Sequence, residues 1–193
     1  MSAQAADARA DLEAAWIRRI AAGDRQAFEE LYHAYHQRVF RYVVRLVHDR
    51  ERAEEVTSEA LVDVWKGAGT FKGRSRPSTW IFGIAHHKAL NAVRRRPLAE
   101  VELEHAEAVP DRGEGPETGV ALAALRESVR RALERLSPEH HAVVELTHYH
   151  GFSYGEIAEI MKCPVNTVKT RMFYARKQLQ AHLEHMGVTG ATG

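Results

Sequence analysis

The sequence predicts an all-α protein of two small helical domains joined by a flexible acidic linker. Apolar residues recur every three or four positions along most of the chain, which is the period of an amphipathic helix. No Asn-Gly or Asp-Gly pair lies between alternating apolar runs, so the usual signal of a β-hairpin is missing. The stretch 98–118 is acidic, contains proline and glycine and has few large apolar residues, which predicts the linker.

The first domain is expected at 11–97, after an N-terminus at 1–10 that we expect to be disordered. A short helix, 12–22, ends at Gly23, because glycine readily adopts the left-handed conformation that closes a helix. The second helix, 25–47, has an apolar face with helical spacing. That face consists of Phe28, Leu31, Tyr32, Tyr35, Val39, Tyr42, Val43 and Leu46.

Two further helices complete the first domain. Asp49 is placed to cap a helix at 50–67, because its side chain can accept a hydrogen bond from a free amide of the first turn. The inward side chains of that helix are expected to be Val56, Leu61, Val64 and Trp65. A basic loop with glycines follows, and Pro77 suits the first turn of a fourth helix that continues to about Arg95.

The second domain is expected at 119–186, with a disordered C-terminus at 187–193. Ser137 followed by Pro138 predicts a helix start, since serine caps a helix and proline fits its first turn. Gly151 is placed to end that helix.

A helix-turn-helix follows in the second domain. Ser153 and Glu156 form a capping box, in which each side chain can satisfy an exposed amide. The turn is predicted at 162–164, and a longer helix runs from Val165 to about Gln180. Two helices joined by so short a turn are typical of DNA-binding proteins that place the second helix in the major groove.

The second helix of this unit has two different faces. At about 100° per residue, Val165, Val168, Met172, Ala175 and Leu179 form one apolar stripe. The opposite face carries Asn166, Lys169, Thr170, Phe173, Tyr174 and Lys177, flanked by Arg171 and Arg176. Cations suit phosphates and guanine edges, and aromatic rings suit thymine methyl groups. The alternative is an ordinary amphipathic helix with a basic outer face.

Charge is sorted along the chain. Residues 23–97 contain fourteen Lys or Arg against nine Asp or Glu, and 165–180 contain four cations and no acid. Between them, 98–119 contain seven acids against one arginine. A polyanion-binding protein needs such sorting, whereas a merely solvated surface does not.

Other function classes are excluded by composition and motif. The first residues lack the basic start and apolar core of a signal peptide, and no apolar run approaches the about 20 residues of a membrane span. The single cysteine, Cys163, rules out an internal disulfide and fits a reducing cytoplasm, where we expect the protein to reside. No nucleophile–base pair, phosphate loop or carboxylate dyad is present, so we expect no enzyme.

Several motifs resemble the extracytoplasmic-function (ECF) sigma factors of the bacterial sigma-70 family. They are 22–28, 53–56 and 78–85 in the first domain, and 151–158 and 163–171 in the second. The resemblance covers most of the chain, with two separate motif sets in the family's order. It implies that the first domain is sigma region 2 and the second is sigma region 4. It also implies a transcription initiation factor that binds core RNA polymerase, selects promoters and helps to melt DNA.

The resemblance implies three sets of site residues. Binding at the −35 element is assigned to Asn166, Thr167, Lys169, Thr170, Arg171, Phe173, Tyr174, Arg176 and Lys177. Binding at the −10 element is assigned to Phe71, Lys72, Arg74, Ser75, Arg76, Ser78, Thr79, Trp80, Lys88, Asn91, Arg94 and Arg95. Docking on core polymerase is assigned to Asp49, Glu54, Glu55, Glu59 and Trp65.

The residues themselves support the −10 assignment through composition. Aromatic rings interleaved with cations suit single-stranded DNA, since bases stack and the backbone needs neutralising. Trp80 has an alternative role as a core residue. The chain departs from the family pattern at Ser58, where glutamine is common, and at His87 and Asn91, where asparagine and aspartate are common.

The resemblance also implies partners. They are the β′ clamp and β flap of core polymerase, promoter DNA and an anti-sigma factor, with a monomer expected when the protein is free. The alternative class is a helix-turn-helix regulator that acts without polymerase. The twelve histidines invite a metal-binding interpretation, but no Cys-x-x-Cys pair accompanies them, so we expect neither a metal nor a cofactor. Cys163 is interpreted as a small apolar residue in the turn, with a redox sensor as the alternative.

Overall fold

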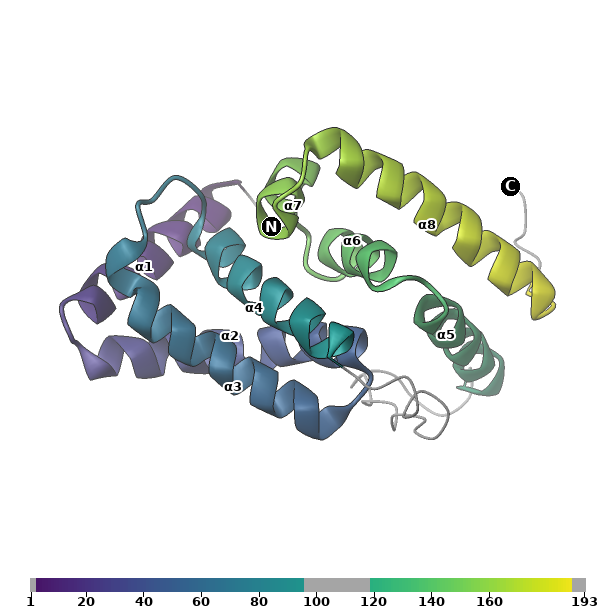
Figure 1. Ribbon diagram of the computed structural model, residues 1–193, viewed down its shortest axis with the longest axis horizontal. Helices are drawn as coiled ribbons and strands as arrows, with labels where there is room; N and C mark the ends of the chain where they lie inside the picture. The colour runs from purple at the N-terminus through teal and green to yellow at the C-terminus, as the bar shows by residue number, and fades with distance from the viewer. Residues whose placement is uncertain (1–2, 96–118, 189–193) are drawn as a thin grey trace.

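The computed structural model describes residues 3–95 and 119–188. Over these residues the chain is built from helices, and no β-strand is present in this described part (Figure 1). The expected all-α class is therefore confirmed. The linker expected at 98–118 lies outside the described residues, as do 189–193 of the expected disordered C-terminus.

The first half of the chain forms a bundle around α2. Its elements are α1 (Ala3–Ala21), α2 (Arg25–Val47), α3 (Arg50–Gly67), the 3-10 helix η1 (Ala68–Thr70) and α4 (Pro77–Arg94). Helices α2, α3 and α4 pack on one another, and α1 covers α2 and η1. Leu31, Tyr35 and Leu61 are fully buried in this bundle. The bundle therefore has its own apolar core.

Helix ends in this bundle follow local chemistry. The Asp24 side chain accepts a hydrogen bond from the Ala27 amide, and Asp49 accepts one from the Arg52 amide. Pro77 occupies the first turn of α4. The expected cap at Asp49 and the expected start at Pro77 are confirmed.

The N-terminal helix is longer than expected. Residues 3–10, expected to be disordered, belong to α1. The physical reason is that alanine, which is abundant here, is the best helix former. An ion pair between Arg9 and Glu13, 2.9 Å apart and one turn along the helix, stabilises the same segment. Asp7 also lies 3.5 Å from Arg76 of the loop before α4.

The second half of the chain forms a smaller helical unit. It consists of α5 (Gly119–Glu134), α6 (Pro138–His148), α7 (Tyr154–Met161) and α8 (Val165–His185). Both halves of the predicted capping box are made: the Ser153 hydroxyl accepts from the Glu156 amide, and the Glu156 carboxylate accepts from the Ser153 amide at 2.9 Å. Lys162 ends α7 in the left-handed conformation, with φ of 49°. The helix-turn-helix is therefore present, and α8 runs five residues past the expected Gln180.

The two units pack against each other. Helix α7 lies on α4, and α6 approaches α2 (Figure 1). The approach is close at Gly83, where an added Cβ would stand 3.9 Å from the Cα of Ile160. Helical pattern in the sequence carries no information on this arrangement.

Candidate nucleic-acid and polymerase interfaces

Helix α8 separates a packed face from an exposed face. Val168, Met172 and Ala175 are buried against the unit, as the apolar stripe predicted. Phe173 is 63% exposed and Tyr174 is 49% exposed, with ring centroids 5.4 Å apart. Two neighbouring aromatic rings in solvent are costly unless a partner covers them.

The cations of α8 lie beside these rings. Lys169, Arg176 and Lys177 are exposed, together with Asn166 and Thr170. Thr167 and Arg171 are half-buried, and the Arg171 guanidinium lies 3.8 Å from the Cys163 sulfur. Most of the residues assigned to −35 binding therefore share one accessible surface.

One member of the apolar stripe was placed wrongly. Val165 is 40% exposed, because it opens the first turn of α8 and extends beyond the surface on which the helix packs. Leu179 is half-buried at the other end of the stripe. The stripe is therefore an inward face only in its middle.

The loop before α4 places aromatic and cationic side chains together. The Trp80 ring is half-buried, with its centroid 5.1 Å from that of Phe71, and it lies over Gly67. Lys72 and Arg74 are exposed at the tip of the loop, where Gly73 adopts a φ of 66°. Trp80 is therefore both a packed side chain and an accessible one.

Other members of the −10 set differ in their availability. Arg76, Asn91, Arg94 and Arg95 are exposed, and Ser75 and Ser78 are half-buried. Thr79 is 2% exposed, because it faces the core side of the first turn of α4, so it is not accessible to DNA in this arrangement. Its neighbours Ser78 and Trp80 are half-buried, and the sequence does not show which way Thr79 points.

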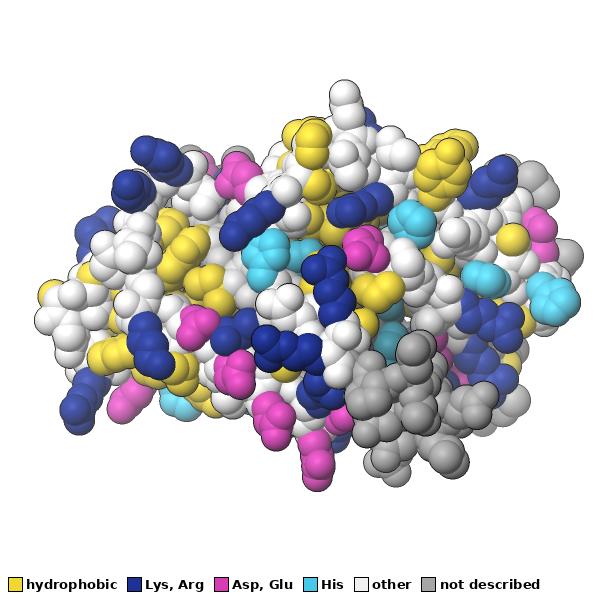
Figure 2. All heavy atoms as spheres, viewed as in Figure 1, with side chains coloured by type: hydrophobic (Ala, Val, Ile, Leu, Met, Phe, Trp, Pro, Cys, Tyr) yellow, Lys and Arg dark blue, Asp and Glu magenta, His cyan; other side chains and the backbone are white. Residues whose placement is uncertain are grey.

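Lys88 belongs to a charged cluster with α3. Its ammonium nitrogen lies 3.2 Å from Glu59 and 3.0 Å from Asp63. A residue assigned to DNA therefore pairs with one assigned to polymerase. Acidic side chains follow the edge of the molecule formed by α3, beside cationic ones over α4 (Figure 2).

The outer face of α3 is open. Glu55 and Glu59 are exposed, while Glu54 is half-buried and lies 3.6 Å from the His36 ring. Beside them is a shallow groove lined by Arg25, Phe28, Glu29, Val62 and Trp65. Of the groove residues, the sequence assigned only Trp65 to polymerase docking. Val62 could have been found as an apolar residue that lies off the inward face of α3, and it is 43% exposed.

Two family models match the chain. They are "Sigma-70 region 2" over residues 31–97 and "Sigma-70, region 4" over residues 126–179. The chain belongs to the sigma-70 family. The unit formed by α1–α4 is called region 2 from here on, and the unit formed by α5–α8 is called region 4.

Curated relatives place the protein among RNA polymerase sigma factors of the ECF group. The RNA polymerase sigma-H factor of Pseudomonas aeruginosa is 32% identical over 178 residues, which cover 87% of this chain and 92% of the relative. The ECF RNA polymerase sigma-E factor of Escherichia coli is 33% identical, with coverage of 84% and 90%. The chain is a transcription initiation factor, and the alternative of a polymerase-independent regulator is not supported.

Two solved structures share the fold. One is CnrH in complex with the cytosolic domain of CnrY, with a TM-score of 0.66 and 22% identity, covering 90% of this chain and 98% of that one. The other is the sigma factor RpoE in complex with the anti-sigma factor NepR from Bartonella quintana, with a TM-score of 0.67 and 22% identity, covering 81% and 96%. Within the described helices of this sigma factor, none is long and apolar enough to cross a membrane.

A buried polar network joins regions 2 and 4. Arg45 of α2 donates a hydrogen bond of 2.8 Å to Glu145 of α6, which is completely buried. The His141 ring lies 3.5 Å from the same carboxylate. Burial alone would raise the pKa of Glu145, but His141 and Arg45 outweigh it, so the pKa lies below its ordinary value. Arg45 also lies over the Tyr149 ring, 4.1 Å from its centroid.

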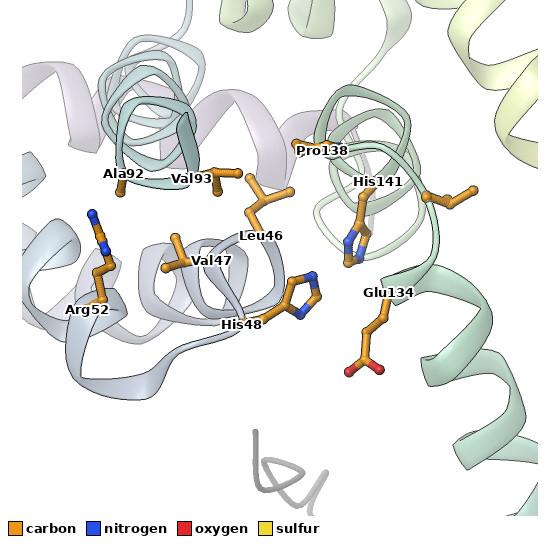
Figure 3. A pocket seen from close by; sticks show the side chains of 10 residues that line it. Leu46, Val47, His48, Arg52, Ala92, Val93, Glu134, Pro138 and His141 are labelled. Carbon is orange, nitrogen blue, oxygen red and sulfur yellow. The ribbon is translucent and has the colours of Figure 1, made fainter. Parts of the chain in front are cut away.

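A cavity of about 210 Å³ adjoins this network. His48 and His141 line it with their rings stacked, centroids 5.7 Å apart, and Glu134 of α5 lines it as well (Figure 3). Both regions contribute to its walls, which are otherwise mostly apolar. Sequence reasoning missed these contacts, because their partners are about a hundred residues apart and no motif joins them.

A buried histidine, His86, and a half-buried one, His150, also lie near the region boundary. Burial lowers the pKa of His86 to about 3 and that of His150 to about 4, so both are neutral at neutral pH. The Tyr42 hydroxyl lies 2.7 Å from Nδ1 of His86. Among the described residues, no three histidine, cysteine or acidic side chains are grouped as a metal site would require.

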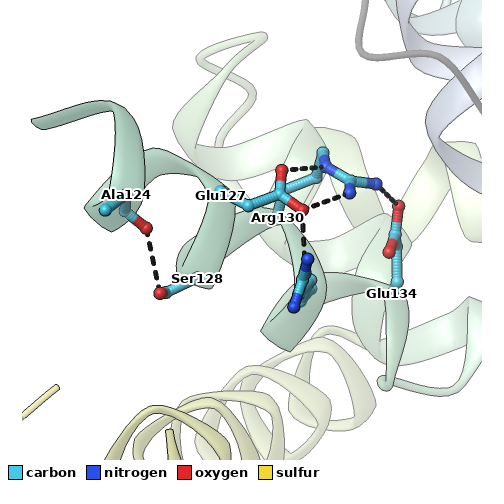
Figure 4. Close-up of polar contacts among 6 residues, drawn as sticks. Ala124, Glu127, Ser128, Arg130 and Glu134 are labelled. Carbon is cyan, nitrogen blue, oxygen red and sulfur yellow. Dashed lines mark hydrogen bonds and ion pairs between the residues drawn. The ribbon is translucent and has the colours of Figure 1, made fainter. Parts of the chain in front are cut away.

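Unlike the Arg45–Glu145 pair, the charged groups of α5 pair within their own helix. Glu127 receives hydrogen bonds from Arg130 and Arg131, and Arg130 also donates to Glu134 (Figure 4). The bonds from Arg130 and then Arg131 lower the pKa of Glu127 to about 2. These pairs stabilise α5 locally, whereas the Arg45–Glu145 pair depends on how the regions are arranged.

Proposed function

We propose that this sigma factor reads the −35 promoter element as duplex DNA with the exposed face of α8. The observation that carries this assignment is the exposed pair Phe173 and Tyr174 among cations, on a helix whose residues 165–180 contain no acid. Lys169 and Thr170 share that face. A helix fits the major groove, and cations beside aromatic rings can contact phosphates and base edges together.

The −10 element is read by the loop before α4 and by α4 itself. Phe71 and Trp80 offer stacking surfaces, and Lys72, Arg74 and Arg76 offer positive charge around them. Stacking of this kind suits unpaired bases. Region 2 therefore binds the melted strand, with Thr79 removed from the contact set because it is buried.

Core polymerase is bound mainly through the outer face of α3. Glu55 and Glu59 are accessible there, and the groove beside Trp65 adds exposed apolar surface. An acidic patch with an aromatic residue at its side suits a basic partner, here the β′ clamp. The β flap is the corresponding partner of region 4, and the protein is a monomer when free.

An anti-sigma factor controls the protein. Support comes from two related structures: the sigma factor RpoE of Bartonella quintana in complex with the anti-sigma factor NepR, and CnrH in complex with the cytosolic domain of CnrY. The exposed aromatic pair of α8 and the open face of α3 are the surfaces that such a partner would cover. The protein acts in the cytoplasm and is not an enzyme.

Run-off transcription tests the proposal. Core polymerase is supplied with the protein and with a promoter selected from a random library by the resulting holoenzyme. A specific start that needs both proteins is expected. Specific DNA binding by the free protein, with no start in the presence of polymerase, would instead support an independent regulator.

The docking assignment is tested separately by binding to core polymerase. Glu55→Lys and Glu59→Lys together are expected to weaken binding at least tenfold, because each reverses a charge at a rim of opposite sign (about 1.4 kcal/mol per tenfold). Arg18→Glu, an equally exposed charge reversal on α1, is the matched control. Equal binding by the double variant and the control would move the docking surface elsewhere.

A further inference from the structure

The cavity of about 210 Å³ is separate from the surfaces proposed for promoter DNA and core polymerase. Its walls come from α2 with its C-terminal cap, and from α3, α4, α5 and α6 (Figure 3). None of the residues that line it belongs to the sets assigned to DNA or to polymerase. A ligand that binds here would therefore be distinct from both of those partners.

The size of the cavity restricts the ligand to a small molecule. An apolar cavity of about 150 Å³ can bind benzene, whereas sites for drug-sized ligands measure about 300–1,000 Å³. This cavity therefore admits one aromatic ring with one or two small substituents. Leu46, Val93 and Leu136 offer apolar surface to such a ring.

Arg52 gives one side of the cavity a positive charge. Its side chain is half-buried, and no carboxylate of the described residues forms an ion pair with it. Glu134 is the acidic lining residue, and it is already paired with Arg130 of its own helix. Screening by water is weak beside apolar walls, so the remaining charge of Arg52 favours an anion.

Two imidazole rings form the polar part of the opposite side. His48 and His141 are stacked, with centroids 5.7 Å apart. His141 is 4% exposed, and its Nε2 atom lies 3.5 Å from the buried carboxylate of Glu145, which holds the ring in place. In Figure 3 Arg52 and the imidazoles lie on opposite sides of the cavity, with Leu46 between them. An elongated ligand can therefore meet a cation at one end and imidazole nitrogens at the other.

We propose that this cavity binds a small aromatic carboxylate with a hydrogen-bonding group opposite the carboxylate. The carboxylate pairs with the Arg52 guanidinium, in the planar arrangement that this pair favours. The ring lies against Leu46 and Val93, and the opposite group bonds to an imidazole of His48 or His141. A neutral ligand of the same shape leaves Arg52 unpaired and binds more weakly.

Nuclear magnetic resonance titration of the full chain tests the site, with para-hydroxybenzoate as the probe. The imidazole C–H signals of His48 and His141 should shift and saturate, with a half-saturating concentration of about 1 mM or less for so small a ligand. Benzoate, which lacks the hydroxyl group, should bind about threefold more weakly. The neutral para-hydroxybenzyl alcohol should bind about tenfold more weakly, because it cannot form an ion pair with Arg52.

Two substitutions distinguish this cavity from other surfaces that could bind the probe. Arg52→Met keeps most of the apolar stem and removes the charge, so it should weaken binding of para-hydroxybenzoate by about tenfold or more. Lys66→Met, which removes an exposed cation of the same helix, is its matched control. Val93→Phe fills the cavity and should abolish saturation, whereas Val165→Phe, at the exposed start of α8, should not.

Any of three results overturns the proposal. They are no saturable shift of either imidazole, equal affinity for para-hydroxybenzoate and its neutral alcohol, and equal affinity in Arg52→Met and Lys66→Met. Saturation that survives in Val93→Phe, shown by circular dichroism to be folded, overturns it as well; if that variant does not fold, the comparison of Arg52→Met with Lys66→Met decides. None of these results depends on promoter recognition, so the site is tested independently of the proposed function.

Discussion

Helices α8 and α4 both combine aromatic rings with cations, but they present them differently. On α8, Phe173 and Tyr174 lie in solvent. On α4, Trp80 is half-buried under Phe71, and Lys88 is paired with acids of α3. The first surface suits the rigid duplex that we propose for it. The second would have to release side chains before binding, which suits the melted strand that we propose for it.

The largest expected difference between the two helices is the loss of stability when one phenylalanine of each is replaced by alanine. Phe82 of α4 is fully buried, so Phe82→Ala is expected to lower the free energy of unfolding by about 3–5 kcal/mol. Phe173→Ala on α8 should change it by about 0.5 kcal/mol or less, since its ring is already in solvent. Urea unfolding followed by circular dichroism measures both. Similar losses in the two variants would mean that α8 packs against something else.

Phe173 is also expected to contribute to binding of the −35 element. Phe173→Ala or Lys169→Ala should weaken holoenzyme binding to a −35 element by about 1–3 kcal/mol, because each removes one side chain from base edges or phosphates. Electrophoretic mobility shifts with matched and mismatched −35 sequences provide the measurement. Arg18→Ala serves as the control, and unchanged promoter preference in both α8 variants would refute the assigned face.

The free energy of unfolding should fall in acid because His150 gains a proton more easily in the unfolded chain than in the fold. Its folded pKa of about 4 lies below the ordinary 6.5, so the unfolded chain binds more protons as pH falls below that value. From pH 7 to 5 this residue should remove roughly 2 kcal/mol from the free energy of unfolding. Facing it are Glu145, which raises the pKa, and Arg38, Arg41 and Arg45, which lower it.

A single substitution isolates that effect. His150→Phe keeps a ring against Phe82 and removes the titrating group, so the variant should lose less stability than the parent between pH 7 and 5. Thermal unfolding at several pH values reports the difference. Parallel pH profiles for the two proteins would show that His150 is solvated in solution.

The smallest expected effect concerns the start of the helix-turn-helix. Ser153→Ala should lower the free energy of unfolding by about 1 kcal/mol, because the Glu156 amide loses its acceptor. Ser58→Ala, an exposed serine within α3, is the control. If both variants unfold alike, the capping box contributes nothing to stability.

Sequence reasoning succeeded where the cause is local. Caps at Asp49 and Ser153 and the start at Pro77 depend on a few neighbouring residues, and the inward residues of α8 follow from helical spacing. It failed at Thr79, whose inward direction depends on how α4 packs in the fold. It also missed the extension of α1, although alanine content and the Arg9–Glu13 pair are local causes.

The partners of Arg45 show the same limit more clearly. Nothing near that residue in the chain indicates Glu145, since the two meet only when α6 approaches α2. The residues assigned to DNA were found because a resemblance supplied their roles. The groove beside Trp65 and the pair of Arg45 with Glu145 required the packing of helices to be known.

The carboxylate of Glu156 makes two contacts through separate oxygens. Oε2 accepts hydrogen bonds from the Ser153 amide at 2.9 Å and hydroxyl at 2.7 Å, while Oε1 lies 3.9 Å from Arg76. The two contacts are independent, so the capping box that starts α7 does not require Arg76 to stay beside Glu156. The start of the helix-turn-helix is therefore stabilised from within region 4 alone.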